Sequence, residues 1–568
     1  MIKTRMRDIT PPVPTARLAV AVALAIASMV AVAADEPATA AKDSTFKFDG
    51  YVRTEFSWNM KNWKDTANYD DQYKMSMARA TVRTNMEWTP IKDLTIVGKL
   101  RGSREYKTSF LDHLEKNGAN NYNQADGTGN IMDLYNKADI RELYVDWQAT
   151  DRIKFRVGRQ QIVWGETDFF AANDMVHGFD LTWRSFLEPA NEETRKPLNL
   201  IKMNIDVPEA RGAIETFIRP GWDRKHDIGT EIDIYGGRWS SQPYASVDFR
   251  NIDPYNMKNK KGDYEDVTGG IRWTGTTDNF NYSVSYLKTF WQSPILNASS
   301  TDFVVPPGGL FFVPKTIGAK NVVPAPSGFS AGEVIYPKVD VYGFTLAGYS
   351  PAADAVFSTE WAYVKDAPYQ INNFNGKFGA CGAVSCNSLP SIAVAPGFDG
   401  VTRKNLVTWM VRMDKNLSFV QDLLGAEKPM FTSVQLFDKW IQGYDKNEHL
   451  LNSVGWGAKT EEHSLLLTGI FALSYASGRI QPGLVVGADL TYKGGFAVPS
   501  VVFELSKNVK WKVEYDYFWD GGHWRDTSPG GNCPAHPPNG GGSNCDSSGL
   551  FGYFHNRDQL YTSLNYQF

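Results

Sequence analysis

The sequence has few cysteines, no excess of either charge and no long apolar segment beyond its first 34 residues. Four cysteines occur in 568 residues, and 59 Lys and Arg residues nearly balance 63 Asp and Glu residues, which gives a net charge of −4. This balance argues against a basic nucleic-acid-binding protein and against an acidic disordered chain. Because each membrane-spanning helix needs about 20 apolar residues, the mean hydropathy of −0.36 argues against a protein built from many such helices.

Aromatic residues, in contrast, are abundant. The chain contains 17 Trp, 26 Tyr and 32 Phe, which together make up 13% of it. Two classes of protein remain compatible with this composition: a large soluble β-rich protein and a membrane β-barrel. The barrel is compatible with the low hydropathy because only every second residue of its strands faces lipid.

The N-terminal residues have the three parts of a secretory signal peptide. A basic segment is followed by an apolar run from Leu18 to Ala34, which ends in a small-residue Ala-Val-Ala pattern. The run is short for a membrane-spanning helix, so an uncleaved anchor is the less favoured alternative. We therefore predict a cleaved signal peptide over residues 1–33 and a single exported domain over residues 34–568.

The four cysteines form two pairs, each in a segment rich in Gly, Ser, Asn and Pro. Cys381 and Cys386 are five positions apart, and Cys533 and Cys545 are twelve positions apart. In an exported protein this spacing predicts two local disulfides. A zinc site needs about four clustered ligands, and only the second pair has histidines nearby, so we expect neither a metal nor another cofactor.

From residue 46 onward, apolar and polar residues alternate with the period of two that is typical of β-strands. In the first such segment one face carries Phe46, Phe48, Val52, Phe56 and Trp58, and the other carries Lys47, Asp49, Tyr51, Arg53, Glu55 and Ser57. Similar segments follow at residues 78–88, 465–475 and 511–518. Soluble β-sandwiches alternate in the same way, so the pattern predicts strands without deciding between the two classes.

The lengths of the connections do decide between them. About 20 candidate strands can be counted, and the links after even-numbered strands are short: 89–91, 149–151, 207–209, 241–243, 351–353 and 477–479. The links after odd-numbered strands are mostly long: 60–75, 105–137, 163–197, 292–336, 366–403, 440–463 and 520–556, with a short exception at 493–495. Outer-membrane barrels have short periplasmic turns and long extracellular loops. We therefore predict an all-β, antiparallel, up-and-down transmembrane barrel of 16–20 strands with both ends in the periplasm.

The last strand gives an independent indication. Phe568 ends the sequence, and the residues at every second position before it are Tyr566, Leu564, Thr562 and Leu560. This pattern resembles the terminal aromatic strand by which barrel-insertion machinery recognises outer-membrane proteins. The expected location is the bacterial outer membrane. The expected partners are outer-membrane lipid, a small-molecule solute and the insertion machinery, with no nucleic acid.

If the apolar face of each strand meets lipid, the other face lines the lumen, and in the early strands that face is heavily charged. The candidate lining residues are Arg53, Glu55, Arg79, Arg83, Lys99, Arg101, Lys154 and Arg156. Carboxylates on neighbouring strands, such as Glu142 and Asp146, are expected to pair with them. Such ladders set a transverse field for a passing solute; the alternative is that they only stabilise the wall.

Two long loops contain further candidates. The loop at 161–197 mixes aromatic and charged side chains, as suits an inward-folded constriction, and contains Trp164, Glu166, Asp168, His177, Asp180 and Arg184. The loop at 296–336 is unusually apolar for a water-exposed segment and contains Phe303, Leu310, Phe311 and Phe312. We expect it to narrow the barrel mouth or to receive an apolar ligand. The alternative is that the loops pack on one another over the barrel.

A short motif in this region resembles a known family. Gly-Arg-Gln at 158–160, followed by Trp-Gly-Glu at 164–166, is similar to the corresponding segment of the DUF1302 family of Gram-negative outer-membrane proteins. The sequence departs from the family pattern at 177–180, where His-Gly-Phe-Asp replaces an Asn-Pro-x-Asp-like element. The resemblance implies a channel or exporter for hydrophobic or organic compounds, in some members associated with steroid or storage-polyester metabolism and with efflux pumps.

Three functions follow as hypotheses. The leading one is an outer-membrane channel for small organic, hydrophobic compounds, acting passively or with a periplasmic or inner-membrane transport partner. The second is a general or anion-selective porin. The third is a surface enzyme or adhesin, because Ser330 lies in a Gly-x-Ser-x-Gly motif at 328–332. That motif needs a strand-to-helix turn, whereas here prolines precede it and a predicted strand follows, so we expect no enzymatic activity.

Overall fold

The computed structural model describes the following residues: 45–61, 70–118, 131–165, 167, 170, 172–188, 191–231, 238, 252–253, 264–293, 295–297, 332–371, 401–448, 450–451, 460–519, 551, 554 and 557–568. Several predictions fall outside these residues. They are the signal peptide, both cysteine pairs, the short link at 241–243, the four apolar loop candidates, Glu166, Asp168 and Ser330.

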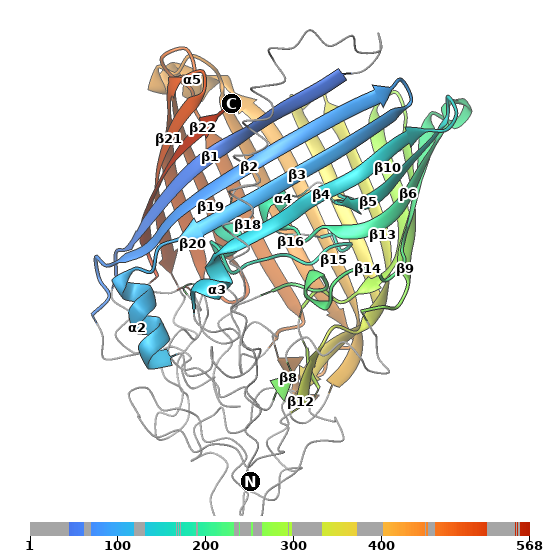
Figure 1. The fold of residues 1–568 in the computed structure, drawn as a ribbon, viewed down its shortest axis with the longest axis horizontal. Helices are drawn as coiled ribbons and strands as arrows, with labels where there is room; N and C mark the ends of the chain where they lie inside the picture. Colours follow the sequence, from blue (N-terminus) through green and yellow to red (C-terminus); the bar gives the residue numbers. More distant parts are fainter. Residues whose placement is uncertain are drawn as a thin grey trace, which may run out of the picture.

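Eighteen of the described strands form a closed antiparallel barrel (Figure 1). In ring order they are β1 (Thr45–Asn59), β2 (Met75–Ile91), β3 (Leu94–Glu105), β4 (Lys137–Gln148), β5 (Ile153–Gln160), β6 (Leu198–Val207), β7 (Gly212–Arg219), β9 (Thr268–Thr276), β10 (Phe280–Phe290), β13 (Lys338–Ser350), β14 (Ala355–Ile371), β15 (Val401–Leu417), β16 (Met430–Gln442), β18 (His463–Ala472), β19 (Ile480–Asp489), β20 (Gly495–Ser506), β21 (Val509–Trp519) and β22 (Gln559–Gln567). The ring closes where β22 pairs with β1, with Leu564 opposite Thr54. The predicted outer-membrane-type barrel of 16–20 strands is therefore confirmed.

The remaining described elements are short. The helices are α2 (Ser109–Gly118), α3 (Met132–Tyr135), α4 (Asn191–Thr194) and α5 (Ser418–Leu424), with 3-10 turns η1 (Ser185–Leu187), η2 (Pro208–Ala210), η3 (Lys225–Asp227) and η5 (Lys446–Glu448). β17 (Leu450–Leu451) pairs antiparallel with the end of β14, and a separate small sheet contains β8 (Ile252–Asp253), β11 (Ile295–Asn297) and β12 (Gly332–Ile335). Among the described residues, no helix is long and apolar enough to span a membrane.

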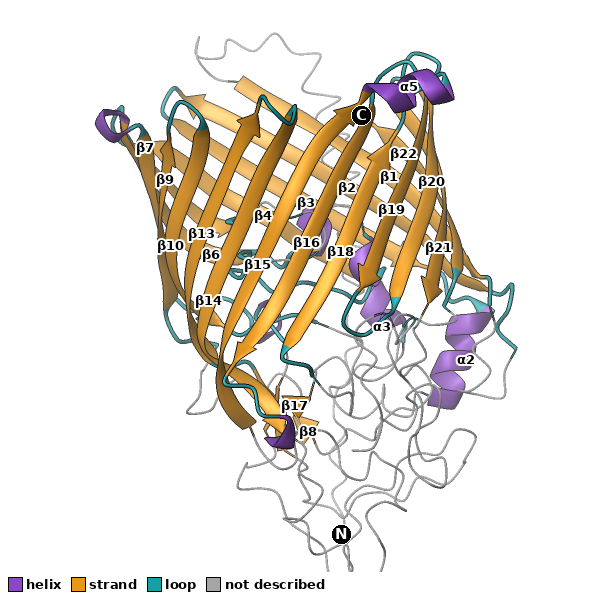
Figure 2. Cartoon of the chain, turned by 180° about the vertical axis from the view of Figure 1, so that it is seen from behind, coloured by secondary structure: helices purple, strands orange, loops and turns teal. Residues whose placement is uncertain are grey.

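The two rims of the barrel differ in the length of their connections. At one rim adjacent strands are joined by short turns, such as 92–93 and 507–508, and Phe568 and α5 lie at this rim (Figure 1). At the other rim the connections are long, and α2 and β8 lie there (Figure 2). The short β19–β20 link at 490–494 is the predicted exception. β7 pairs directly with β9, so residues 220–267 form one long connection and the strands number eighteen.

The alternation of the strands separates an outer face that is mainly apolar from an inner face that is mainly polar. Val284 and Val411 are 52% and 43% exposed on the outside, as expected for side chains that meet lipid. On the inside, Arg79 is 1% exposed and Asp516 is 0% exposed. Inward side chains this deeply buried mean that protein occupies much of the lumen beside these strands.

Candidate functional site inside the barrel

The connection between β5 and β6 runs through the interior of the barrel. We call its described residues, which are 161–165, 167, 170, 172–188 and 191–197, the crossing segment. Trp164 contacts β7, the Thr408 hydroxyl of β15 donates a hydrogen bond to the Ala172 carbonyl at 2.7 Å, and Arg184 contacts β21. These three strands lie about a third of the ring apart. The segment therefore spans the lumen.

Helix α4 of the crossing segment and Glu188, which precedes it, are held against β1, β2 and β3 by four of the predicted wall cations. Glu193 is 4% exposed and pairs with Arg83 and, at 3.2 Å, with Arg101. The other contacts are Glu192 with Arg83, Glu192 with Lys99 at 3.0 Å, and Glu188 with Arg53 at 3.2 Å. Burial raises the pKa of Glu193, but the charges of Arg101 and Arg83 outweigh it and lower this pKa to about 2. The carboxylate therefore stays ionised at neutral pH.

Arg184 ties the same segment to the far end of the chain. Its Nη2 donates hydrogen bonds to Glu514 Oε1 at 2.7 Å and to Asp516 Oδ2 at 3.1 Å. Its guanidinium carbon lies 3.6 Å from the centre of the Tyr561 ring. All of these side chains are buried. Since buried charges are tolerated only when they are paired, this contact fixes the position of the segment relative to β21.

An aromatic cluster lies next to Arg184 and is centred on Phe186. The centre of the Phe186 ring is 5.2 Å from that of Phe496, 5.6 Å from Phe551, 5.5 Å from Phe554 and 6.2 Å from Phe518, all in edge-to-face geometry. Such pairs add about 0.5–1.5 kcal/mol each beyond the burial of their area. The sequence analysis missed this cluster, although Phe518 stands out as an aromatic residue on the charged face of its strand.

His177 and Asp180 connect parts of the crossing segment to one another and to β4. His177 Nε2 accepts a hydrogen bond from the Ile162 N–H at 2.8 Å, and Nδ1 donates to the Lys196 carbonyl at 2.9 Å. Burial, together with nearby Arg195, lowers the pKa of His177 to about 3. The neutral imidazole thus joins the two ends of the segment, while Asp180 pairs with Lys137 at the start of β4.

Trp164 fixes the beginning of the crossing segment against the wall. Its side chain is 1% exposed, and its indole N–H donates to Glu215 on β7. The centre of its indole is 5.3 Å from that of the Phe217 ring, and the Arg272 guanidinium lies 5.6 Å from it. This side chain therefore anchors the segment and is not accessible to a solute.

The remaining predicted lining residues contact other parts of the wall. Arg79 pairs with Glu105 at 3.0 Å, and Lys154 and Arg156 share Asp146 at 2.8 and 2.6 Å. Glu55 accepts a hydrogen bond from the Tyr561 hydroxyl at 2.9 Å. The structure thus places Glu55, Lys154 and Arg156 in strand-to-strand contacts, whereas Arg79 makes both kinds of contact, because its guanidinium also lies 4.4 Å from the centre of the Trp183 ring of the crossing segment.

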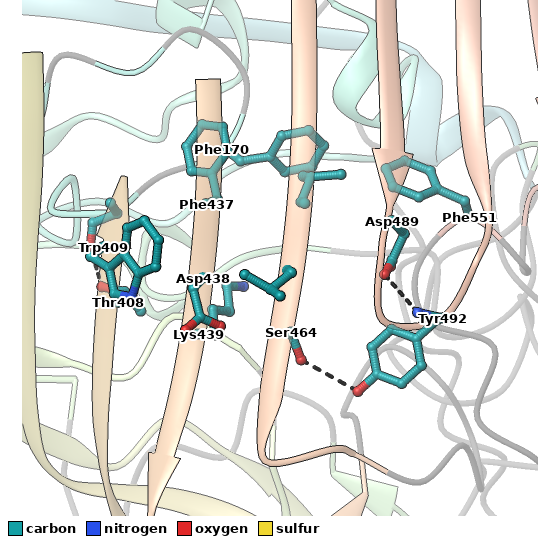
Figure 3. A pocket seen from close by; sticks show the side chains of 13 residues that line it. Phe170, Thr408, Trp409, Phe437, Asp438, Lys439, Ser464, Asp489, Tyr492 and Phe551 are labelled. Atoms are coloured by element: carbon teal, nitrogen blue, oxygen red, sulfur yellow. Dashed lines mark hydrogen bonds between the residues drawn. The ribbon is translucent and has the colours of Figure 1, made fainter. Parts of the chain in front are cut away.

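A cavity of about 140 Å³ remains between the crossing segment and the wall formed by β15, β16, β18 and β19 (Figure 3). Phe170, Phe437 and Phe551 lie at one end of it, and Lys439, Ser464 and Tyr492 lie at the other. The other lining residues are Ala172, Thr408, Trp409, Asp438, Leu465, Leu466 and Asp489. The sequence analysis did not single out this side of the barrel. Within the described residues, no cluster of His, Cys, Asp or Glu is suited to a metal ion.

Two solved structures show a distant similarity to the chain. OccAB1 of Acinetobacter baumannii is similar with a TM-score of 0.42 and 9% identity, over 92% of this chain and 96% of that one. OccK1 (OpdK) of Pseudomonas aeruginosa is similar with a TM-score of 0.40 and 6% identity, over 92% and 98% of the two chains. Similarity at this level concerns the fold alone. No curated protein matches the sequence significantly.

The family model with the description "Protein of unknown function (DUF1302)" matches residues 15–568. The match covers nearly the whole chain and confirms the resemblance seen in the Gly-Arg-Gln and Trp-Gly-Glu motifs. The chain therefore belongs to the DUF1302 family.

Proposed function

We propose that this protein is an outer-membrane channel for small organic, hydrophobic compounds. The carrying observation is that a firmly held crossing segment divides the lumen and leaves a cavity with an aromatic end. A barrel of eighteen strands is wide enough to conduct unless protein fills it. A lumen narrowed in this way, with Phe170, Phe437 and Phe551 along the remaining space, favours organic solutes over hydrated ions.

Passage is proposed to be passive, with the short-turn rim in the periplasm. A solute enters between the long extracellular loops, passes the crossing segment and leaves at the rim where Phe568 lies. A periplasmic or inner-membrane transport partner at that rim would give the movement a direction.

The pairing of the wall charges favours this function over an anion-selective porin. Arg83, Lys99 and Arg101 each contact carboxylates of the crossing segment, and Arg156 contacts Asp146. Paired charges produce a much weaker net field than an unpaired arginine ladder. The apolar cavity is therefore the stronger indication of selectivity.

Two measurements on the full chain test the proposal. Cells of a Gram-negative host that express the protein should take up the hydrophobic dye 1-N-phenylnaphthylamine several times faster than cells without it. The purified protein should conduct only a small steady current in planar bilayers. A large ohmic current without faster dye uptake would identify a general porin instead. If the protein produced no current and no dye uptake, the proposed channel function would be overturned.

A further inference from the structure

The cavity beside the crossing segment combines an apolar end with a single cation. Lys439 lies on β16 opposite Thr408 of β15 and Ser464 of β18, so these three residues share the inner face at one level. Phe437, two residues earlier on the same face, contacts Phe170 with a centre-to-centre distance of 6.2 Å. The ammonium and the aromatic rings thus line the same space from opposite ends (Figure 3).

Lys439 differs from other inward-facing lysines in its contacts. Lys404 pairs with Glu448 at 2.6 Å, and Lys202 pairs with Glu215 at 3.2 Å. The Lys439 side chain is exposed to the cavity, and its ammonium has neither an ion pair nor a hydrogen bond within the part of the chain that the structure describes. A charge left open in a space lined largely by apolar groups is suited to a counter-ion supplied by a ligand.

Two carboxylates near Lys439 are engaged elsewhere. Asp489 acts on the ammonium electrostatically, but its Oδ1 accepts the backbone N–H groups of Thr491 at 3.1 Å and Tyr492 at 2.8 Å. Asp438 is the neighbour of Lys439 on β16 and also lines the cavity. Its Oδ2 is bonded to His463 Nδ1 at 2.8 Å. Neither carboxylate lies within ion-pair distance of the Lys439 ammonium.

The polar end also offers hydroxyl groups. The Tyr492 oxygen accepts the Glu461 N–H at 2.9 Å and lies 3.3 Å from Ser464 Oγ. One hydroxyl of this pair can therefore turn toward a ligand oxygen in the cavity. Donors that converge beside a cation, with apolar walls beyond them, are the usual composition of a small-molecule site.

We infer that this cavity binds an amphipathic organic anion, with its carboxylate on Lys439 and its apolar body against Phe170, Phe437 and Phe551. An apolar cavity of about 150 Å³ holds a benzene molecule, so this one suits a single aromatic ring or a short alkyl chain with an acid group. The inference rests on the proposed function, because it takes the occupant to be the transported solute. Phe170 and Ala172 belong to the crossing segment, so the ligand touches the element that narrows the lumen.

Isothermal titration calorimetry on the full chain in detergent tests the site with two matched probes, 4-phenylbutyrate and the uncharged 4-phenylbutanol. Lys439→Gln should weaken phenylbutyrate binding by about tenfold or more, since charge-assisted hydrogen bonds are the strong ones, and should leave phenylbutanol binding unchanged. Lys404→Gln makes the same change at a paired lysine and should have no effect. Asp489→Asn removes a competing charge and should strengthen phenylbutyrate binding.

The other possible results would each overturn either this binding site or the proposed channel function. No phenylbutyrate binding by the wild-type protein, or equal binding by Lys439→Gln, would overturn the inference. The heat-dependent shift in gel mobility that folded barrels show would verify that each variant is folded. The dye-uptake and current measurements distinguish the two proposals: a channel that passes the dye but does not bind phenylbutyrate would overturn this site alone. A protein that binds phenylbutyrate but shows neither current nor uptake would overturn the channel function.

Discussion

Arg184 and Glu514 are 330 positions apart in the chain, yet their side chains are joined by a 2.7 Å hydrogen bond inside the barrel. Arg184 is 1% exposed and Glu514 is 4% exposed. The contact connects the crossing segment to β21, the neighbour of the strand β22 that closes the ring on β1. Correct placement of the crossing segment and closure of the barrel are therefore coupled.

Replacing Arg184 should both destabilise the protein and release the crossing segment. In Arg184→Gln the carboxylates of Glu514 and Asp516 lose their shared cation, and breaking a buried ion pair in this way costs about 3–5 kcal/mol. We expect the folded form to disappear at a lower temperature on gels and the single-channel conductance to rise.

The exposed pair of Arg211 and Asp278, whose side chains are 66% and 85% exposed, provides the control. Exposed pairs contribute little to stability, so Arg211→Gln should match the wild type in both measurements. If Arg184→Gln also matched it, the coupling between the crossing segment and β21 would be wrong.

The contact between Glu193 and the wall cations should depend on pH. Its pKa of about 2 lies below its ordinary value of 4.5, so the stabilisation is complete above pH 4.5 and declines as the pH falls toward 2. The shift corresponds to about 3 kcal/mol. Because the folded carboxylate stays ionised until the pH nears 2, the wild-type conductance should be constant from pH 7 to about pH 4 and rise as the pH approaches 2.

Glu193→Gln should show the raised conductance already at neutral pH and lose this pH dependence. Glu209, which is 63% exposed in its pair with Arg152 at the short-turn rim, is the matched control. Glu209→Gln should retain the wild-type profile. A wild-type conductance that does not change down to pH 2 would argue against the ion pairs of Glu193 as a restraint on the crossing segment.

Phe186→Ala tests the apolar part of the same attachment. Truncating a fully buried phenylalanine usually costs about 3–5 kcal/mol; Phe186 is partly buried and contacts five other rings, so a smaller loss of stability is expected. The variant should conduct more than the wild type while keeping its pH profile, because the charged contacts stay in place. Phe419→Ala at the 66% exposed position in α5 should change neither quantity. A pH profile altered by Phe186→Ala would mean that the ring contacts of Phe186 and the ion pairs of Glu193 do not act independently.

Much of the barrel could be predicted because lipid imposes a period of two on each strand. The alternation at 46–58 matches β1 (Thr45–Asn59), and that at 511–518 matches part of β21. The count of about 20 was slightly high because residues 220–267 contain alternating stretches, whereas β7 pairs directly with β9. Alternation is a local property and does not show which strands are neighbours.

The contacts of the candidate site could be predicted only in part. The mixture of aromatic and charged residues at 161–197 indicated an inward loop, but nothing local connects Arg184 with Glu514 or Glu193 with Arg101. Those partners depend on the path of the segment through the closed ring. The Lys439 cavity was missed for the same reason, since an ion pair for that lysine is present or absent only in three dimensions.

The last prediction concerns Phe568 at the seam between β22 and β1. Phe568 and Gly50 exchange two backbone hydrogen bonds of 3.0 Å, and a Cβ on Gly50 would lie 2.8 Å from the Phe568 ring. The glycine thus gives the terminal ring room to lie over β1. If the insertion machinery recognises this ring, Phe568→Ala should reduce the folded fraction several-fold in cells but refold normally in detergent, where no machinery is present. Tyr349→Ala, at a position of β13 that is 55% exposed and lies outside the last strand, is the control. If Phe568→Ala reduced the folded fraction equally in cells and in detergent, the ring would be needed to close the seam and not for recognition by the insertion machinery.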